Sequence, residues 1–298
     1  MGFFSFSLDK PGRGVDPNEP QKRSFFRFFE LFFRKFTRYI KINLLYCLAM
    51  IPTFAIVFLL MVGAGGGWFN VDQTAETGAY AAMIVAFFGA SLFASLFGMG
   101  PATAGVTYIL RNYVKEEHAW IWSDFKDTFK TNFKQSLIVY AINVVALVVI
   151  YVAIMFYAQQ GGVIGALRYL LYMVAIVFAM MNMYIYPMMV TFNLSIKELY
   201  RNAFIFAVGK LPSNLLVLVL VIFMHLGLPA LAVMYGGGFF FVILLVLALL
   251  EVLITQSFTA FMINFNVYPK LKKYMLDMTG AQEKRKETSL FEDDVTRG

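Results

Sequence analysis

The chain has 298 residues, of which 60% are hydrophobic and only 14% are charged. A soluble domain carries about 45–50% apolar and about 25% charged residues, so this composition excludes a water-soluble fold and predicts a bundle of helices in a membrane. The formal net charge is +7. Because the basic residues flank apolar segments, this charge favours contact with anionic lipid headgroups and gives no reason to expect a nucleic-acid partner.

The composition changes along the chain and divides it into three parts. Residues 1–23 are predicted to be a disordered N-terminal segment, residues 24–270 a six-helix transmembrane domain, and residues 271–298 a charged, flexible C-terminal tail. The single cysteine, Cys47, excludes a disulfide within one chain. The two histidines, His118 and His225, lie far apart. We therefore expect neither a metal site nor a cofactor.

The segment 24–41 is rich in both phenylalanine and basic residues. On a helix, its Arg and Lys side chains share one face and its phenylalanines share the other. This pattern is typical of a helix that lies in the membrane interface, and we expect Phe25, Phe29, Phe32 and Phe36 to contact the bilayer there. The alternative is that the phenylalanine face packs on the protein's own cytoplasmic side.

Six long apolar segments follow and are predicted to cross the membrane. A hydrocarbon core of about 30 Å needs about 20 helical residues, and each segment reaches that length within the error of its boundaries. A proline at the same end of every second segment suggests three hairpins of the same orientation. The segments are 43–62, 79–97, 136–157, 165–186, 211–234 and 239–264.

The basic residues indicate how the segments are oriented. Of the 25 Lys and Arg residues, 24 fall before the first segment, in the connections after the second and fourth, or in the C-terminal tail; the exception is Arg168. Positive residues accumulate on the cytoplasmic side of membrane proteins. We therefore expect both termini in the cytoplasm.

Two features are expected where the second segment meets the cytoplasm. A continuous helix over 80–114 would be about 52 Å long, too long for the hydrocarbon core, so we expect a break at Gly98, Gly100 and Pro101. After it, Trp120 and Trp122 precede phenylalanines and lysines spaced by four residues. Tryptophan is enriched at the headgroup level, so these two residues are predicted to begin a second interfacial helix.

Two ionisable residues lie inside the predicted spans, His225 in the fifth and Glu251 in the sixth. Charged groups in a bilayer are costly and often functional. Pro229 follows His225 by four residues and frees its carbonyl from the helix. We expect the two side chains to face the bundle interior as a binding site and to come within reach of each other directly or through water or a ligand. A bridged arrangement is favoured because their depths differ by about 9 Å. The alternative is a structural hydrogen-bonded pair, or Glu251 bonded to Gln256 or to an asparagine of another helix.

Three short stretches resemble a known family. They are Ile42-Asn43-Leu44-Leu45, Gly100-Pro101-Ala102-Thr103-Ala104 and Asp124-Phe125. Together they resemble the YesL-like family of bacterial membrane proteins, over roughly residues 24–270. The resemblance implies a plasma-membrane protein linked to carbohydrate uptake, since family members are often encoded beside carbohydrate ABC importers. It implies no catalytic residues.

Two functions remain open at this stage. No hydrolase, zinc-peptidase or phosphate-binding motif is present, so we do not expect an enzyme, and an intramembrane enzyme would have only His225 and Glu251 to use. The first interpretation is an accessory component that binds the subunits of a carbohydrate ABC importer. The second is a secondary transporter or channel for a small polar solute, with His225 and Glu251 in its path.

Overall fold

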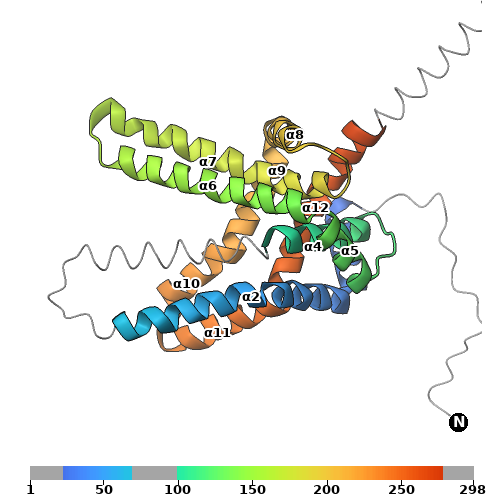
Figure 1. Ribbon diagram of the computed structural model, residues 1–298, viewed down its shortest axis with the longest axis horizontal. Helices are drawn as coiled ribbons and strands as arrows, with labels where there is room; N and C mark the ends of the chain where they lie inside the picture. The colour runs from blue at the N-terminus through green and yellow to red at the C-terminus, as the bar shows by residue number, and fades with distance from the viewer. Residues whose placement is uncertain (1–22, 69–98, 278–298) are drawn as a thin grey trace, which may run out of the picture.

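The computed structural model describes residues 23–68 and 99–277, and every regular element within them is helical. The predicted all-α fold is therefore confirmed. The α-helices are α1 (Ser24–Arg34), α2 (Phe36–Trp68), α4 (Met99–Val114), α5 (Ile121–Thr131), α6 (Phe133–Ala158), α7 (Gly162–Met189), α8 (Ile196–Gly209), α9 (Leu211–Ile222), α10 (Leu228–Tyr235), α11 (Phe240–Leu250) and α12 (Gln256–Leu271) (Figure 1). Shorter turns connect the last helices: η1 (Phe223–Gly227), η2 (Gly237–Phe239), η3 (Glu251–Thr255) and η4 (Lys272–Leu276).

Four of the described helices are long and apolar enough to cross a membrane. They cover Phe133–Ala158, Gly162–Met189, Leu211–Tyr235 and Phe241–Leu276. At about 1.5 Å per residue, even the 25 residues of Leu211–Tyr235 exceed the thickness of the hydrocarbon core. Large apolar side chains cover their outer surfaces, as a lipid environment requires. The predicted segment 43–62 lies within α2, and the segment 79–97 falls outside the described residues.

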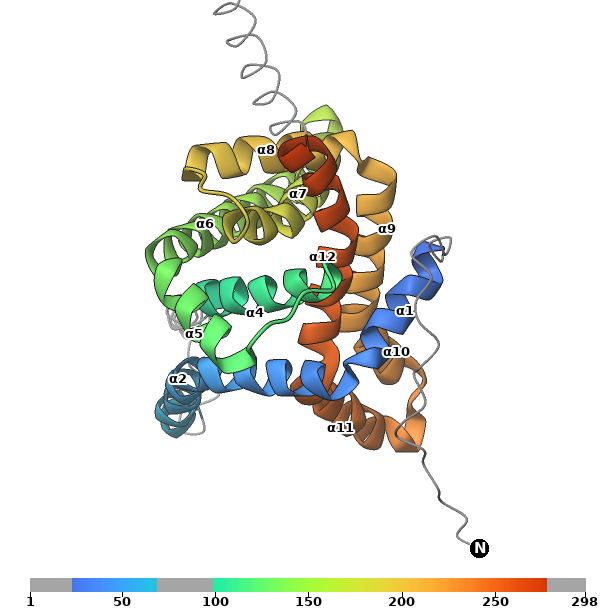
Figure 2. The same cartoon turned by 90° about the vertical axis from the view of Figure 1, so that its right-hand side faces the viewer.

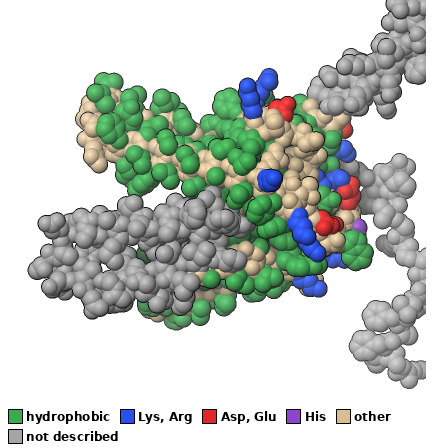
Figure 3. Space-filling model, in the orientation of Figure 1, with side chains coloured by type: hydrophobic (Ala, Val, Ile, Leu, Met, Phe, Trp, Pro, Cys, Tyr) green, Lys and Arg blue, Asp and Glu red, His purple; other side chains and the backbone are tan. Residues whose placement is uncertain are grey.

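Charge and apolar surface lie at opposite ends of the molecule. Figure 3 shows the Lys, Arg, Asp and Glu side chains gathered at one end, while the hairpin of α6 and α7 extends from it with an apolar surface. The hairpin turns at Gly162, whose φ of +58° suits glycine. Arg168, the exception in the sequence pattern, lies on α7 a short distance beyond this turn. The segregation seen in the sequence is thus also a segregation in space.

Helix α4 is the centre of the charged end. It contacts α2, α5, α6, α7 and α12, and most of its side chains are buried; Figure 2 shows it crossing between α12 and α5. Small residues permit this close packing: a Cβ on Gly100 would lie 2.5 Å from the carbonyl oxygen of Ser136 in α6. At the far end, the buried Arg111 donates to the carbonyl of Val190 and to Thr191 Oγ1, where α7 ends. A cation is favourable at a helix C-terminus.

The helix break expected at Gly98, Gly100 and Pro101 is not seen in the described part of this segment. Gly100 and Pro101 are both helical and lie in the first described turn of α4, and Gly98 falls outside the described residues. The last helix also differs from expectation. It continues through Pro269 to Leu276, past the domain boundary predicted at residue 270. Proline removes one backbone N–H and its ring crowds the carbonyl four residues earlier, yet the helix is retained on both sides of Pro269.

The predicted interfacial helix divides into α1 and the start of α2, with Lys35 between them. Phe32 was expected in the membrane interface, and this prediction is wrong: it is only 5% exposed and packs against Phe258 and Tyr39, at ring distances of 4.9 and 4.7 Å. One edge of the phenylalanine face is used for packing on α12. The outer residues remain exposed; these are Phe25, Phe29 and Phe36. The packing alternative is therefore confirmed for one edge of the face, and contact of the exposed phenylalanines with the membrane stays a prediction.

Ion pairs connect α1 to the turn after α4. Arg27 and Arg34 contact the two carboxylate oxygens of Glu116 at 3.1 and 2.8 Å. The hydrogen bond from Arg34, together with the one from Arg27, holds the pKa of the Glu116 carboxyl below its usual value. Glu116 has a φ of +63°, a conformation that costs free energy in a residue other than glycine. The two arginines stabilise the side chain on this strained turn.

The predicted second interfacial helix corresponds to α5. Trp120 and Trp122 are both exposed, as expected at a headgroup level. Trp120 occupies the N-cap position, and its backbone N–H donates to Asp124 Oδ2 at 2.8 Å. Phe125 points inward, where a Cβ on Gly105 of α4 would meet its ring at 2.7 Å. Asp124 thus accepts a hydrogen bond at the start of the helix, and Phe125 packs the helix against α4.

Gly100→Ala should destabilise the fold. The added Cβ meets backbone atoms of α6 that no side-chain rotation can move, and such overpacking costs about 1–3 kcal/mol. Gly209→Ala is the matched control, because no atom lies within 4 Å of a Cβ there and alanine is the better helix former. Thermal unfolding in detergent should show a lower Tm for Gly100→Ala alone. Equal Tm values for the two variants would contradict the close packing of α4 on α6.

Candidate functional site

Two π-helical turns interrupt the last two membrane helices, and each carries one of the predicted site residues. The turn η1 lies between α9 and α10 and contains His225, and η3 lies between α11 and α12 and begins at Glu251. A π-helical turn disturbs the regular backbone ladder, and such turns are frequent at functional sites. Next to η1, Pro229 has no N–H to donate to the preceding turn. The sequence therefore explains the irregularity near His225 directly.

His225 and Glu251 are in direct contact. The distance from His225 Nδ1 to Glu251 Oε1 is 3.2 Å. The other ring nitrogen, Nε2, lies 3.1 Å from Thr259 Oγ1, and Gln256 Nε2 donates to Glu251 Oε1. The prediction that the two residues approach each other is confirmed, and so is the proposed bond between Glu251 and Gln256. All four side chains form one polar cluster between the two helices.

The expected bridging molecule between His225 and Glu251 is not needed. That expectation rested on a depth difference counted from the predicted ends of the two spans. The two depths were counted from opposite ends of the membrane, with an assumed thickness between them. Counted from the turn η2 (Gly237–Phe239) that joins the two helices, His225 lies 12 residues before the turn and Glu251 lies 12 residues after it. At about 1.5 Å per residue the two residues lie at the same depth, and the side chains meet without a bridge.

Asn43 of α2 holds the turn at Glu251 in place. Its side chain is fully buried, and Nδ2 donates to the carbonyl oxygens of Glu251 and Val252 at 2.9 and 2.7 Å. Its Oδ1 accepts from the backbone N–H of Ser257 at 2.8 Å. One side chain therefore satisfies three backbone groups around η3. Inside a bilayer each of these groups would otherwise cost several kcal/mol.

The sequence reasoning did not select Asn43 as a site residue. It lies in the Ile42-Asn43-Leu44-Leu45 stretch that carried part of the family resemblance. An amide at the beginning of an apolar span was the available signal, since such groups form hydrogen bonds between helices. The partner could not be found in the same way, because it is backbone more than 200 positions away.

The His225–Glu251 pair lies on the wall of a cavity of about 730 Å³. Their side chains are 24% and 40% exposed, so the pair is not sealed inside the protein. Apolar residues make up most of the remaining wall; examples are Phe32, Phe36, Leu228, Leu247 and Phe258. A small molecule that enters this cavity meets one acid–base pair on a mostly apolar surface. Ligand sites commonly have this composition.

A second intramembrane polar group is structural. Asn143 Nδ2 donates to Asn182 Oδ1 at 2.6 Å, and the Tyr200 hydroxyl donates to Asn143 Oδ1 at 2.7 Å. Asn182 in turn donates to the carbonyl of Phe178. These bonds connect α6, α7 and α8. Amide side chains within membrane helices commonly form such interhelical hydrogen bonds.

The sequence reasoning missed a polar cluster around Lys270, at the charged end. Lys270 Nζ donates to Ser213 Oγ at 2.7 Å, Asn266 Oδ1 at 2.9 Å and Asn214 Oδ1 at 3.0 Å. Asn214 is fully buried and also accepts from the Tyr184 hydroxyl at 2.7 Å. The cluster fixes α12 to α9 and α7. Separately, no group of three His, Cys, Asp or Glu side chains within the described ranges could hold a metal ion.

Replacing Asn43 should weaken the fold around Glu251. Asn43→Ala leaves two carbonyls and one N–H without their partner, and an unsatisfied buried group costs about 1–3 kcal/mol. Hydrogen–deuterium exchange in detergent should become faster over residues 251–257, and Tm should fall. Asn193→Ala, in the exposed turn before α8, is the control and should change neither quantity. Unchanged exchange in Asn43→Ala would show that its hydrogen bonds do not stabilise η3.

One part of the chain matches a known protein family. Residues 79–154 match the model of a family described as "Protein of unknown function, DUF624". The described part of this match is α4, α5 and most of α6, which includes Gly100, Gly105 and Phe125. Neither the curated proteins nor the solved structures show a match to the chain.

The matched segment includes α4, the packing centre described above, and it does not contain Asn43, His225 or Glu251. The comparison therefore assigns no activity to the cavity. Together with the four apolar helices, it is compatible with a multi-pass membrane protein of unknown function. The segment 79–154 of this chain is similar to the DUF624 family.

Proposed function

We propose that the chain crosses the bacterial plasma membrane six times, as three hairpins, with both termini in the cytoplasm. Four apolar helices support this arrangement, and a fifth segment, 43–62, is continuous helix within α2. The segment 79–97 supplies the sixth span. An even number of spans leaves both termini on one side, and the distribution of Lys and Arg favours the cytoplasm for that side.

The function that the geometry supports best is the binding of a small polar solute or a proton at the His225–Glu251 pair, as in a secondary transporter or channel. One observation carries this proposal: the pair is exposed on the wall of an apolar cavity. A lipid chain in the cavity could offer the two groups no hydrogen bond, whereas a polar ligand could. The exposure of the pair leaves both side chains within reach of a ligand.

The pair has chemistry suited to this task. A histidine and a glutamate in contact can share one proton, either as a charged pair or as two neutral groups, so the net charge in the membrane is zero in both forms. A single charge at this depth costs at least about 2.5–3.5 kcal/mol. The same cavity is lined by the hydroxyl-bearing Thr255, so a solute hydroxyl or amide entering it would find a third polar side chain beside the pair.

The second candidate is an accessory component of a carbohydrate ABC importer. The observation in its favour is the aromatic surface at the charged end, where Trp120, Trp122 and Phe25 are exposed. Such residues are enriched at protein interfaces. The resemblance to the YesL-like family supports the same link to carbohydrate uptake. In this case the His225–Glu251 pair would serve only to hold the last two helices together.

Sugar uptake by a strain that lacks the protein, complemented with variants, separates the two candidates. If the pair handles a solute or proton, Glu251→Gln should abolish the uptake that the wild type restores, while the protein remains folded and abundant. Asp127→Asn, an exposed carboxylate on α5, should retain uptake. If the pair is structural, Glu251→Gln should be almost neutral and only Glu251→Leu should reduce abundance. Importer subunits that co-purify with an active Glu251→Gln variant would establish the accessory role instead.

A further inference from the structure

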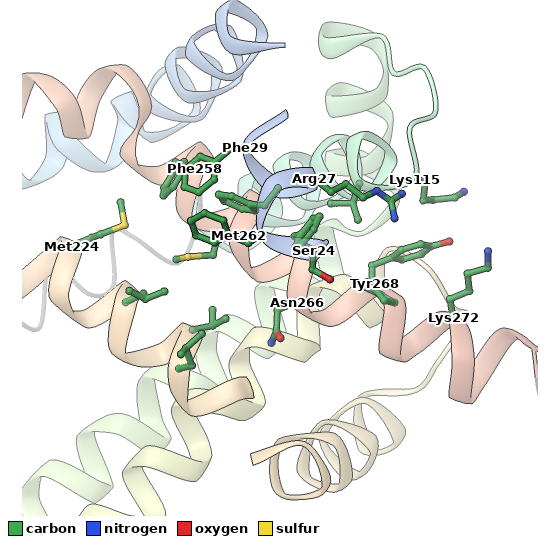
Figure 4. A pocket seen from close by; sticks show the side chains of 18 of the residues that line it. Ser24, Arg27, Phe29, Lys115, Met224, Phe258, Met262, Asn266, Tyr268 and Lys272 are labelled. Atoms are coloured by element: carbon green, nitrogen blue, oxygen red, sulfur yellow. The ribbon is translucent and has the colours of Figure 1, made fainter. Parts of the chain in front are cut away.

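A second cavity opens at the charged end of the molecule, between α1, α9 and α12. Its volume is about 990 Å³. Figure 4 shows that its two ends differ: Arg27, Lys115, Tyr268 and Lys272 lie toward one end, and Phe258, Met262 and Met224 lie toward the other. The cavity is therefore amphipathic along its length. We refer to its ends as the basic rim and the apolar floor.

The basic rim carries more cations than its carboxylates can neutralise. Lys115 Nζ contacts Glu117 Oε2 at 2.5 Å, while Arg27 and Arg34 share the single carboxylate of Glu116. Lys272 forms neither a hydrogen bond nor an ion pair with any residue in the described ranges. An anion at the rim would gain a charge-assisted bond from Lys272 without breaking an existing pair.

The apolar floor extends to the depth of the hydrocarbon core. Leu216, Leu220 and Met224 line it from α9, and the membrane helix that contains them begins at Leu211. At about 1.5 Å per residue, Met224 lies about 20 Å along that helix. With Met224, the exposed side chains of Leu216 and Leu220 thus offer an apolar surface over about two turns that leads away from the basic rim.

We propose that this cavity binds one anionic phospholipid of the cytoplasmic leaflet. The phosphodiester lies at the basic rim, near Lys272 and Arg27, and an acyl chain runs along α9 on the apolar floor. A soluble anion would use only the rim and leave the floor empty. A zwitterionic lipid would place a second cation among the cations of the rim. Only an amphiphile with a net negative headgroup matches both ends of the cavity.

This site is distinct from the His225–Glu251 cavity but adjoins it. Met224 and Phe258 line both cavities. The end of a bound acyl chain would therefore lie against the two side chains that separate the lipid site from the ion pair. The lipid proposal does not depend on the proposed function of that pair.

The test measures the binding of three probes to the purified full-length protein. These are phosphatidylglycerol, phosphatidylcholine with the same chains, and glycerol 3-phosphate as a free headgroup. Native mass spectrometry counts bound lipid, and thermal unfolding reports the increase in Tm that a ligand of the folded state produces. We expect phosphatidylglycerol to bind and to raise Tm, with at least about tenfold weaker binding of each other probe. Equal binding of phosphatidylcholine, or of glycerol 3-phosphate, would overturn the proposal.

Two matched pairs of variants locate the site. Lys272→Gln should weaken phosphatidylglycerol binding about fivefold or more, and Lys126→Gln, an exposed lysine on α5 at the same charged end, should not. Leu216→Trp should close the apolar floor and reduce bound lipid, whereas Leu215→Trp, which does not line the cavity, should leave it unchanged. Mass spectrometry keeps the comparison valid if a variant alters Tm by itself. Equal losses within either pair would show that the lipid binds elsewhere.

Discussion

The candidate site depends on the hydrogen bonds that Asn43 forms with backbone groups of the last membrane helix. A bilayer supplies no water to backbone groups, so any interruption of a membrane helix must find its partners inside the protein. The turn at Glu251 is such an interruption, and Asn43 provides the missing donor and acceptor from α2. Asn43 thereby joins the first membrane segment to the last, at the π-helical turn that begins at Glu251. The position of the carboxylate beside His225 follows from this junction.

The remaining structure fixes the helices from which these residues come. α4 packs against α2 and α12 together, and its buried glycines allow the close approach on α6 and α5. Cations at the charged end complete the arrangement: Arg111 at the end of α7, and Lys270 between α12 and α9. In the apolar half, a hydrogen bond between Asn143 and Asn182 joins α6 to α7. The His225–Glu251 cavity is lined mainly by η1, α10, α11 and η3.

Much of the fold could be predicted from the sequence, because a membrane imposes simple rules. Apolar segment length predicted the positions of α6, α7 and the helices carrying His225 and Glu251, and the Lys and Arg residues predicted the charged end. The direct contact and the role of Asn43 could not be predicted. Both depend on where helices cross, and on π-helical turns that have no sequence signature beyond Pro229. The burial of Phe32 was missed for a related reason: periodicity identifies an apolar face but not the neighbour that covers part of it.

The central claim is that the His225–Glu251 cavity is open to small polar molecules, and cysteine accessibility tests it most directly. In a background carrying Cys47→Ala, Ala248→Cys places a thiol on the cavity wall, whereas Leu249→Cys lies on the neighbouring exposed position outside it. His225 and Glu251 are unchanged in both variants. The account predicts that a small, charged thiol reagent reacts much faster with Ala248→Cys than with Leu249→Cys in liposomes. Equally slow reaction at both positions would contradict it, because the pair would then face lipid or closed protein and could bind no solute.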